Sequence, residues 1–134
     1  MEKVYKLIAD GLVLRNGAVL LVKYDFTPDG QEGWFLPDDL LKYGEAPEKA
    51  LHRILKDQTD LTVKSAKLAE VESFIGKDKS WHLVFHYQVE VSGEERKGEG
   101  VKDLKWFPLN ELPPAKEFAH HGWGRSIIQR LTKK

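Results

Sequence analysis

The sequence contains no cysteine among its 134 residues, which excludes a disulfide framework and a thiolate metal site. It also lacks an excess of either charge, because 21 Lys and Arg residues balance 21 Asp and Glu residues. Nucleic-acid-binding domains usually carry a basic excess or a clustered basic stripe. The composition therefore argues against a nucleic-acid partner, and the absence of cysteine is consistent with a reducing compartment.

Long apolar runs are missing as well. The first ten residues, MEKVYKLIAD, form neither an apolar stretch nor a cleavage signal, and no segment is long and apolar enough to cross a bilayer. A hydrophobic content of 41% and a charged content of 31% are typical of a globular protein. We therefore expect a single cytoplasmic domain over residues 1–134 with no membrane contact.

The sequence does contain a regular succession of strand patterns around one strong helix pattern. Apolar, β-branched runs over residues 4–24 flank Asn16-Gly17, a pair that suits a tight turn, and this predicts a β-hairpin. Apolar residues recur at three- and four-residue spacing from Pro47 to about Thr59. This spacing predicts a helix that begins at the proline.

Beyond this helix the pattern returns to strands. Alternation over residues 68–75 and 81–91 predicts a second hairpin. A short strand is expected at residues 104–107 and a closing helix at residues 122–131. This order of elements predicts a fold of the α/β class, of the α+β type.

One stretch from Leu36 to Val63, LPDDLLKYGEAPEKALHRILKDQTDLTV, holds most of the functional information. It resembles the signature box of the Nudix hydrolases, which cleave nucleoside diphosphates linked to another moiety. That box reads as a glycine, five residues, a glutamate, seven residues, then Arg-Glu-apolar-any-Glu-Glu-any-Gly-apolar. On this spacing Asp39 stands at the first glycine, Glu45 at the glutamate and Arg53 at the arginine.

The resemblance extends over most of the chain. The N-terminal hairpin, the Trp34-x-Leu-Pro lead-in and Trp106 followed by Leu109-x-Glu-Leu all occur in the Nudix order. The resemblance implies the Nudix fold, a mixed β-sheet sandwiched between helices. It also implies a small-molecule nucleotide derivative as the partner. Because dimers are common among Nudix proteins, a homodimer is the assembly that it suggests.

The same resemblance implies hydrolysis assisted by Mg²⁺ or Mn²⁺, but the box has lost most of its acids. Positions 54, 57 and 58 share one helix face, and Nudix enzymes carry three glutamates there. Ile54 cannot bind a cation, Gln58 offers a neutral amide, and Asp57 is shorter than glutamate by one methylene. Mg²⁺ sites need carboxylate oxygens, so we expect hydrolysis to be weak or lost.

The frame of the box is better preserved than its acids. The resemblance assigns Glu45 and Arg53 to fixing the geometry of the box, and we predict that they pair. A surface ion pair between Arg53 and Asp57, four residues apart, is the alternative and would contribute about 0.3–0.5 kcal/mol. If the chain is active, the resemblance assigns Glu45, Arg53 and Asp57 as its catalytic residues.

Asp38-Asp39 replaces a Gly-Gly pair that lies close to phosphate or metal in the family. Two acidic side chains would repel an anionic ligand, or would replace the lost metal ligands together with Glu45 and Asp57. A solvated acidic turn is the third alternative, and it is the one we favour. Asp38, Asp39 and Gln58 are the residues that we expect next to a bound ligand.

Acids outside the box are further metal ligands to consider, because many Nudix enzymes recruit one from elsewhere in the chain. Glu95 and Glu99 lie in a suitable loop, and Glu70 and Glu72 share one face of a predicted strand. For each of them we favour a solvated surface acid. His82 and His86 are four apart on a strand, about 13 Å, which is too far for both to hold one ion.

Two functions of different classes remain open. One is a Mg²⁺-dependent pyrophosphohydrolase with relocated ligands, drawn from Asp38, Asp39, Glu45 and Asp57, that acts on a nucleotide sugar, a dinucleotide or a modified nucleoside triphosphate. The other is a Nudix-fold protein that binds a nucleoside-diphosphate-type ligand and hydrolyses it weakly or not at all. The substitutions in the box favour the second function.

Overall fold

A computed structural model describes residues 3–133, which form one six-stranded sheet with a helix on each side. The elements are β1 (Tyr5–Arg15), β2 (Ala18–Tyr24), β3 (Asp38–Leu40), α1 (Pro47–Thr59), β4 (Thr62–Ile75), β5 (Trp81–Ser92), β6 (Val101–Pro108), the 3₁₀ turns η1 (Leu109–Glu111), η2 (Ala115–Glu117) and η3 (Ala119–Gly122), and α2 (Trp123–Thr132). None of the described helices is long and apolar enough to span a membrane.

The sheet is mixed, as predicted, and β1 lies at its centre. The strand order is β4-β5-β1-β2-β6, and β3 adds to β1. β1 runs parallel to β5, with Tyr5 opposite Trp81 and Val13 opposite Val89, whereas the other pairings are antiparallel. The predicted β1–β2 hairpin turns at Asn16 and Gly17, whose φ angles of 51° and 75° suit an Asn-Gly turn.

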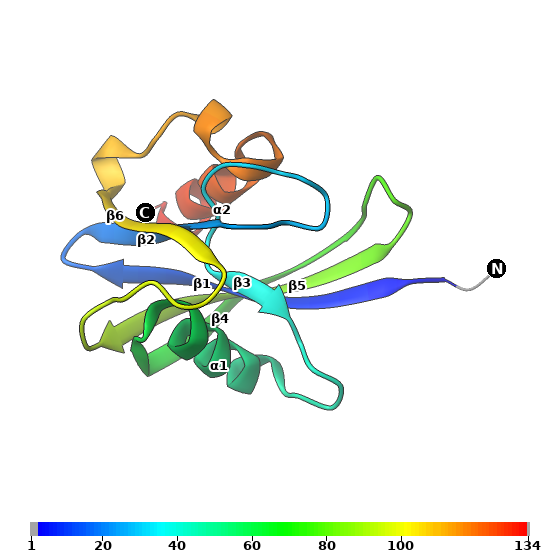
Figure 1. The fold of residues 1–134 in the computed structure, drawn as a ribbon, viewed down its shortest axis with the longest axis horizontal. Coiled ribbons are helices and arrows are strands. Elements are labelled where there is room, and N and C mark those ends of the chain that lie inside the picture. Colours follow the sequence, from blue (N-terminus) through cyan, green and yellow to red (C-terminus); the bar gives the residue numbers. More distant parts are fainter. Residues whose placement is uncertain (1–2, 134) are drawn as a thin grey trace.

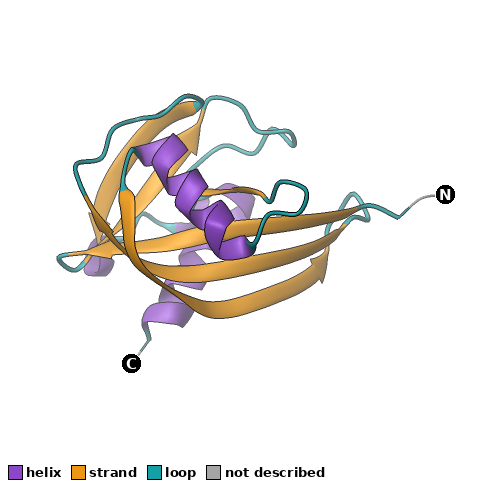
Figure 2. Cartoon of the chain, turned by 90° about the horizontal axis from the view of Figure 1, so that it is seen from below, coloured by secondary structure: helices purple, strands orange, loops and turns teal. Residues whose placement is uncertain are grey.

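The two α-helices cover opposite faces of the sheet (Figures 1 and 2). Neighbouring residues of β1 point to opposite faces, so Leu12 packs into the core on the α2 side and Val13 into the core on the α1 side. The α2-side core comprises Leu12, Val19, Leu21, Trp34, Leu36, Phe118, Ile127 and Ile128. The α1-side core comprises Val13, Leu20, Leu51, Leu55, Leu61, Tyr87, Val89 and Val91.

α1 begins at Pro47, as the sequence predicts, and ends at Thr59, and the C-cap residue Asp60 lies in the left-handed region (φ 61°). Asp60 stands where the Nudix box has glycine, and Asp adopts this conformation more readily than most residues. The backbone N–H of Asp60 donates to the carbonyl of Lys56 and closes the last turn of the helix. The helix therefore keeps the end point that the box requires without the glycine.

Candidate functional site

Glu45 and Arg53 form the predicted pair at the start of α1. The Nε and Nη2 atoms of Arg53 donate to the two carboxylate oxygens of Glu45, each at 2.9 Å. The backbone N–H of Lys42 donates to Glu45, and Arg53 also reaches the carbonyl of Leu40 at 3.0 Å. This bidentate contact holds the loop before α1 against the middle of the helix. The alternative pairing of Arg53 with Asp57 is not formed in the described part of the chain.

The hydrogen bonds from Arg53, followed by the one from Lys42, lower the pKa of Glu45 from 4.5 to about 2. A lowered native pKa contributes stability that is complete above the unfolded value and is lost as the pH falls through the native value. The stability gap between the unmodified protein and Glu45→Gln should therefore be largest above pH 4.5 and shrink toward pH 2. Urea unfolding of both proteins at about pH 7 and about pH 3 measures this gap.

Glu48→Gln is the matched control, because Glu48 is an exposed acid in the first turn of the same helix. Its stability gap should stay small and change little with pH. A Glu45→Gln gap that is the same at both pH values would contradict the role of the ionised pair.

The three box positions that carry acids in Nudix enzymes do not form a ligand set here. Ile54 is 1% exposed and packs with Ala9 and Ala50 in the apolar core between α1 and β1. Asp57 points to solvent from the same helix. Gln58 is buried and turns toward Asp38 at the start of β3.

Gln58 joins a closed network of neutral groups with Tyr24 and the backbone of Asp38. The Gln58 amide nitrogen donates to the Asp38 carbonyl at 2.9 Å, and the Tyr24 hydroxyl donates to the Gln58 amide oxygen at 2.8 Å. The Asp38 N–H in turn donates to the Tyr24 oxygen at 2.9 Å. Burial and the nearby charge of Asp38 raise the pKa of Tyr24, so its hydroxyl stays protonated as a donor. The network links the end of α1 to the start of β3 through uncharged groups.

This arrangement does not fit a Mg²⁺ ion at the box. Such an ion needs several hard oxygen ligands, mostly carboxylates, on one side of an octahedral shell. The amide oxygen of Gln58 is already bonded to Tyr24, and Ile54 offers no ligand atom. Only the exposed carboxylate of Asp57 remains on this helix face.

Asp38 and Asp39 lie in β3, so the expectation of a turn is wrong, although Asp39 is exposed to solvent as expected. Asp38 pairs with Asp10 and Asp39 with Ala9 across the β1–β3 ladder. Burial, followed by the negative charges of Asp10 and Asp39, raises the pKa of Asp38 well above its usual range. β3 forms because its hydrogen-bonding partner, β1, comes from a distant part of the chain.

Glu95 and Glu99 lie in the loop between β5 and β6, next to the end of α1. Glu95 is 3.7 Å from Arg15, and Glu99 is exposed. The loop is held to the helix by its backbone, since the Gly98 N–H donates to the carbonyl of Gln58 at 2.8 Å. Neither glutamate joins other potential ligands in a group of three among residues 3–133.

A buried charged cluster on the α2 side of the sheet is the main feature that the sequence analysis missed. Asp10 is 1% exposed and His86 is 0% exposed, and His86 Nδ1 lies 2.8 Å from both Asp10 oxygens. His86 Nε2 lies 2.8 Å from Oε1 of Glu72, which is bound rather than solvated as we expected. Arg130 likewise holds Glu70.

The sequence held one indication of this cluster. Asp10 stands within the apolar run of a predicted strand, and His86 shares one face of another predicted strand with Val84. A charged residue in such a position needs a partner, because its burial alone is costly. The identity of that partner depends on the parallel β1–β5 pairing.

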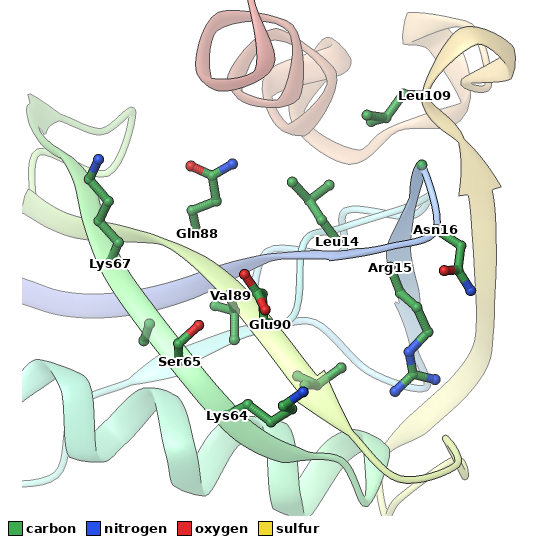
Figure 3. Close-up of a pocket in the computed structure, with 13 residues that line it drawn as sticks. Leu14, Arg15, Asn16, Lys64, Ser65, Lys67, Gln88, Val89, Glu90 and Leu109 are labelled. Atoms are coloured by element: carbon green, nitrogen blue, oxygen red, sulfur yellow. The ribbon is translucent and has the colours of Figure 1, made fainter.

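The surface of the protein has two grooves. The larger, of about 770 Å³, carries Arg15, Lys64 and Lys67 against Glu90 and lies beside β4 and β5 (Figure 3). The smaller, of about 460 Å³, is lined by Tyr24 of the neutral network and by Phe26, whose side chain is highly exposed. Both volumes lie in the range of small-molecule sites.

Known proteins match this chain in sequence and in structure. The family profile described as NUDIX domain matches residues 5–131. The ADP-ribose pyrophosphatase of Methanocaldococcus jannaschii is 33% identical over 108 residues, which cover 78% of this chain and 62% of that protein. The matched region thus spans less than two thirds of the length of this relative.

Solved structures agree on the fold. A MutT NUDIX hydrolase from Burkholderia pseudomallei superposes with a TM-score of 0.83 at 24% identity, covering 97% of this chain and 100% of that one. A bifunctional NMN adenylyltransferase/ADP ribose pyrophosphatase from Francisella tularensis, complexed with AMP and a Mn ion, gives a TM-score of 0.73 at 19% identity. That match covers 96% of this chain and 42% of the bifunctional protein.

Proposed function

Because the chain belongs to the NUDIX domain family, we propose that it binds a nucleoside-diphosphate-type ligand and that its Mg²⁺-dependent pyrophosphohydrolase activity is weak or lost. The closed network of Tyr24, Gln58 and the Asp38 backbone carries this proposal. It occupies the place where the family would gather carboxylates around a cation. The groups of this neutral network are bonded to one another, so the exposed carboxylate of Asp57 is the one acidic ligand that the three box positions offer to that cation.

The size of the expected loss follows from the charge that is missing. Negative charge builds on the phosphate oxygens during cleavage of a diphosphate link, and cations stabilise it. Removing one well-placed electrostatic element costs roughly 10²–10³ in rate. This chain lacks two of the three box acids and has a shortened third, so residual turnover should be small.

The ligand class rests on the relatives, and the groove beside Tyr24 is the place that we propose for it. The curated relative is named an ADP-ribose pyrophosphatase, which makes ADP-ribose the first ligand to test. Lys102 and Lys116 line this groove together with acids such as Asp25, and the two lysines can contact a diphosphate. The exposed ring of Phe26 offers a face for a base. The groove touches the box network directly through Tyr24.

A hydrolysis screen with Mg²⁺ and Mn²⁺ over ADP-ribose, nucleotide sugars, dinucleotides and modified nucleoside triphosphates tests the proposal. We expect little turnover by the unmodified chain and a gain in the Ile54→Glu/Gln58→Glu variant. Its added carboxylates should destabilise the variant without metal, because Ile54 lies in an apolar core. Mn²⁺ should therefore raise the melting temperature of the variant more than that of the unmodified protein.

Gln88→Glu is the matched control, since it adds a carboxylate at a half-buried position outside the box and should gain neither turnover nor metal-dependent stability. In ADP-ribose titrations, Phe26→Ala should weaken binding, whereas Lys67→Gln in the other groove should not. Robust turnover by the unmodified chain that is abolished by Asp38→Ala or Asp39→Ala would refute the loss of catalysis and establish relocated ligands.

A further inference from the structure

Three side chains on the α2 side of the sheet bring potential metal-ligand atoms together. Glu70, Glu72 and His86 each offer one such atom, and these atoms lie within 4.8 Å of one another. Glu70 and Glu72 come from β4 and His86 from β5, so the rigid β4–β5 ladder fixes their spacing. The group lies on the α2 side of the sheet, where Trp123 of α2 donates to Glu72, whereas α1 of the box covers the opposite face (Figure 1).

Asp10 orients the histidine of this group. Its carboxylate lies 2.8 Å from Nδ1 of His86, and both side chains are buried. A carboxylate behind a histidine fixes the ring and its tautomer in the way that is common at metal sites. In a neutral ring held in this way, the Nδ1 proton would face Asp10 and the Nε2 lone pair would face Glu72.

The contact between His86 Nε2 and Glu72 needs a positive charge. In the neutral ring that Asp10 selects, two acceptors would face each other at 2.8 Å in a site where the ring is 0% exposed. Such an arrangement is repulsive unless a cation binds both atoms. A proton on Nε2 or a metal ion between the two groups meets this requirement.

The group holds more acidic than basic side chains. Arg130, which donates to both oxygens of Glu70 at 2.6 and 2.9 Å, is the one permanently charged cation bonded to the group in the described residues. His86 faces both Asp10 and Glu72, and Trp123 donates to the other oxygen of Glu72 at 3.4 Å. A proton on Nε2 and a divalent ion are the two ways to supply the positive charge at this contact, and metal binding distinguishes them.

We propose that Glu70, Glu72 and His86 bind one divalent transition-metal ion of the Zn²⁺ type. One imidazole nitrogen and two carboxylate oxygens suit Zn²⁺, Co²⁺ or Mn²⁺, whereas Mg²⁺ and Ca²⁺ prefer ligand sets of oxygen alone. The two glutamate side chains are 28–29% exposed, so an ion can enter from solvent. Three protein ligands leave a fourth position free for water or a small ligand.

The test is a zinc titration of the whole chain in competition with a chromophoric chelator, together with Co²⁺ absorption spectra. We expect one Zn²⁺ per chain, and ligand-field bands of Co²⁺ that a stoichiometric amount of Zn²⁺ abolishes. Glu72→Gln should remove the bands, and Asp10→Asn should weaken Zn²⁺ binding roughly 10–100-fold by releasing the ring of His86. Excess Mg²⁺ should not displace the ion.

Matched variants separate this site from other zinc contacts. Glu90→Gln changes an exposed acid on the same strand, and His120→Gln/His121→Gln removes two exposed histidines, so all of these proteins should bind Zn²⁺ as the unmodified chain does. Circular dichroism confirms that each variant is folded. Absence of Zn²⁺ binding by the folded unmodified chain would overturn the proposal, as would an affinity that Glu72→Gln and Asp10→Asn leave unchanged.

Discussion

Replacing His86 by leucine is expected to lower the free energy of unfolding by about 3–5 kcal/mol, the range for breaking a buried ion pair from one side. The substitution leaves the carboxylate of Asp10, which is 1% exposed, without the ring that lies 2.8 Å from it. Glu72 loses the same partner but is partly exposed and can turn to water. Most of the cost should therefore come from Asp10.

A double-mutant cycle checks this origin. Asp10→Leu/His86→Leu removes both partners, so its cost should be far smaller than the sum of the two single changes. His82→Leu is the control, because His82 lies on the same face of β5 but is half-buried and stacks on Phe74. Urea unfolding with a chelator present gives all four values. Additive costs of the two single changes would contradict a coupled buried pair.

Replacing Gly98 by alanine is the second change with a large expected effect. A β-carbon at this position would collide with the backbone carbonyl of Asp57 at the end of α1. The loop could then no longer donate from Gly98 to Gln58 and from Arg96 to Thr59, two hydrogen bonds of 2.8 Å each. The last carbonyls of the helix would lose their partners, so we expect a loss of about 2–4 kcal/mol.

Urea unfolding and limited proteolysis of the loop measure the effect of Gly98→Ala. Glu99→Ala is the control, since Glu99 is an exposed neighbour, and it should change the stability by about 0.5 kcal/mol or less. Cleavage within residues 93–100 should become faster in Gly98→Ala and stay the same in Glu99→Ala. A Gly98→Ala protein as stable as the control would show that the loop is not held closely to α1.

The order of elements could be predicted because local patterns encode it. The alternation of Leu12 with Val13 places apolar residues on both faces of a central strand, and the spacing from Pro47 to Thr59 gives the helix. The Glu45–Arg53 pair was predictable from the resemblance to the Nudix box, whose spacing places a glutamate and an arginine at these two positions. These features depend on neighbours within about eight residues.

The remainder of the site depends on contacts between distant segments. Gln58 and Tyr24 are 34 positions apart, and His86 and Asp10 are 76 positions apart. The environment of Asp38 likewise exists only because β3 pairs with β1. A single sequence does not specify which buried polar residues meet across parallel and antiparallel ladders. It shows only that Asp10 and His86 stand where partners are required.

The most direct test of binding without hydrolysis is one experiment on the unmodified protein with ADP-ribose and Mg²⁺. Calorimetric titration gives the affinity, and chromatography of the same samples gives the AMP released. We predict saturable binding with AMP release far below about 1 s⁻¹, the low end of typical enzyme turnover. AMP release at about 1 s⁻¹ or faster would contradict the proposal that Ile54 and Gln58 have removed catalysis from this NUDIX protein.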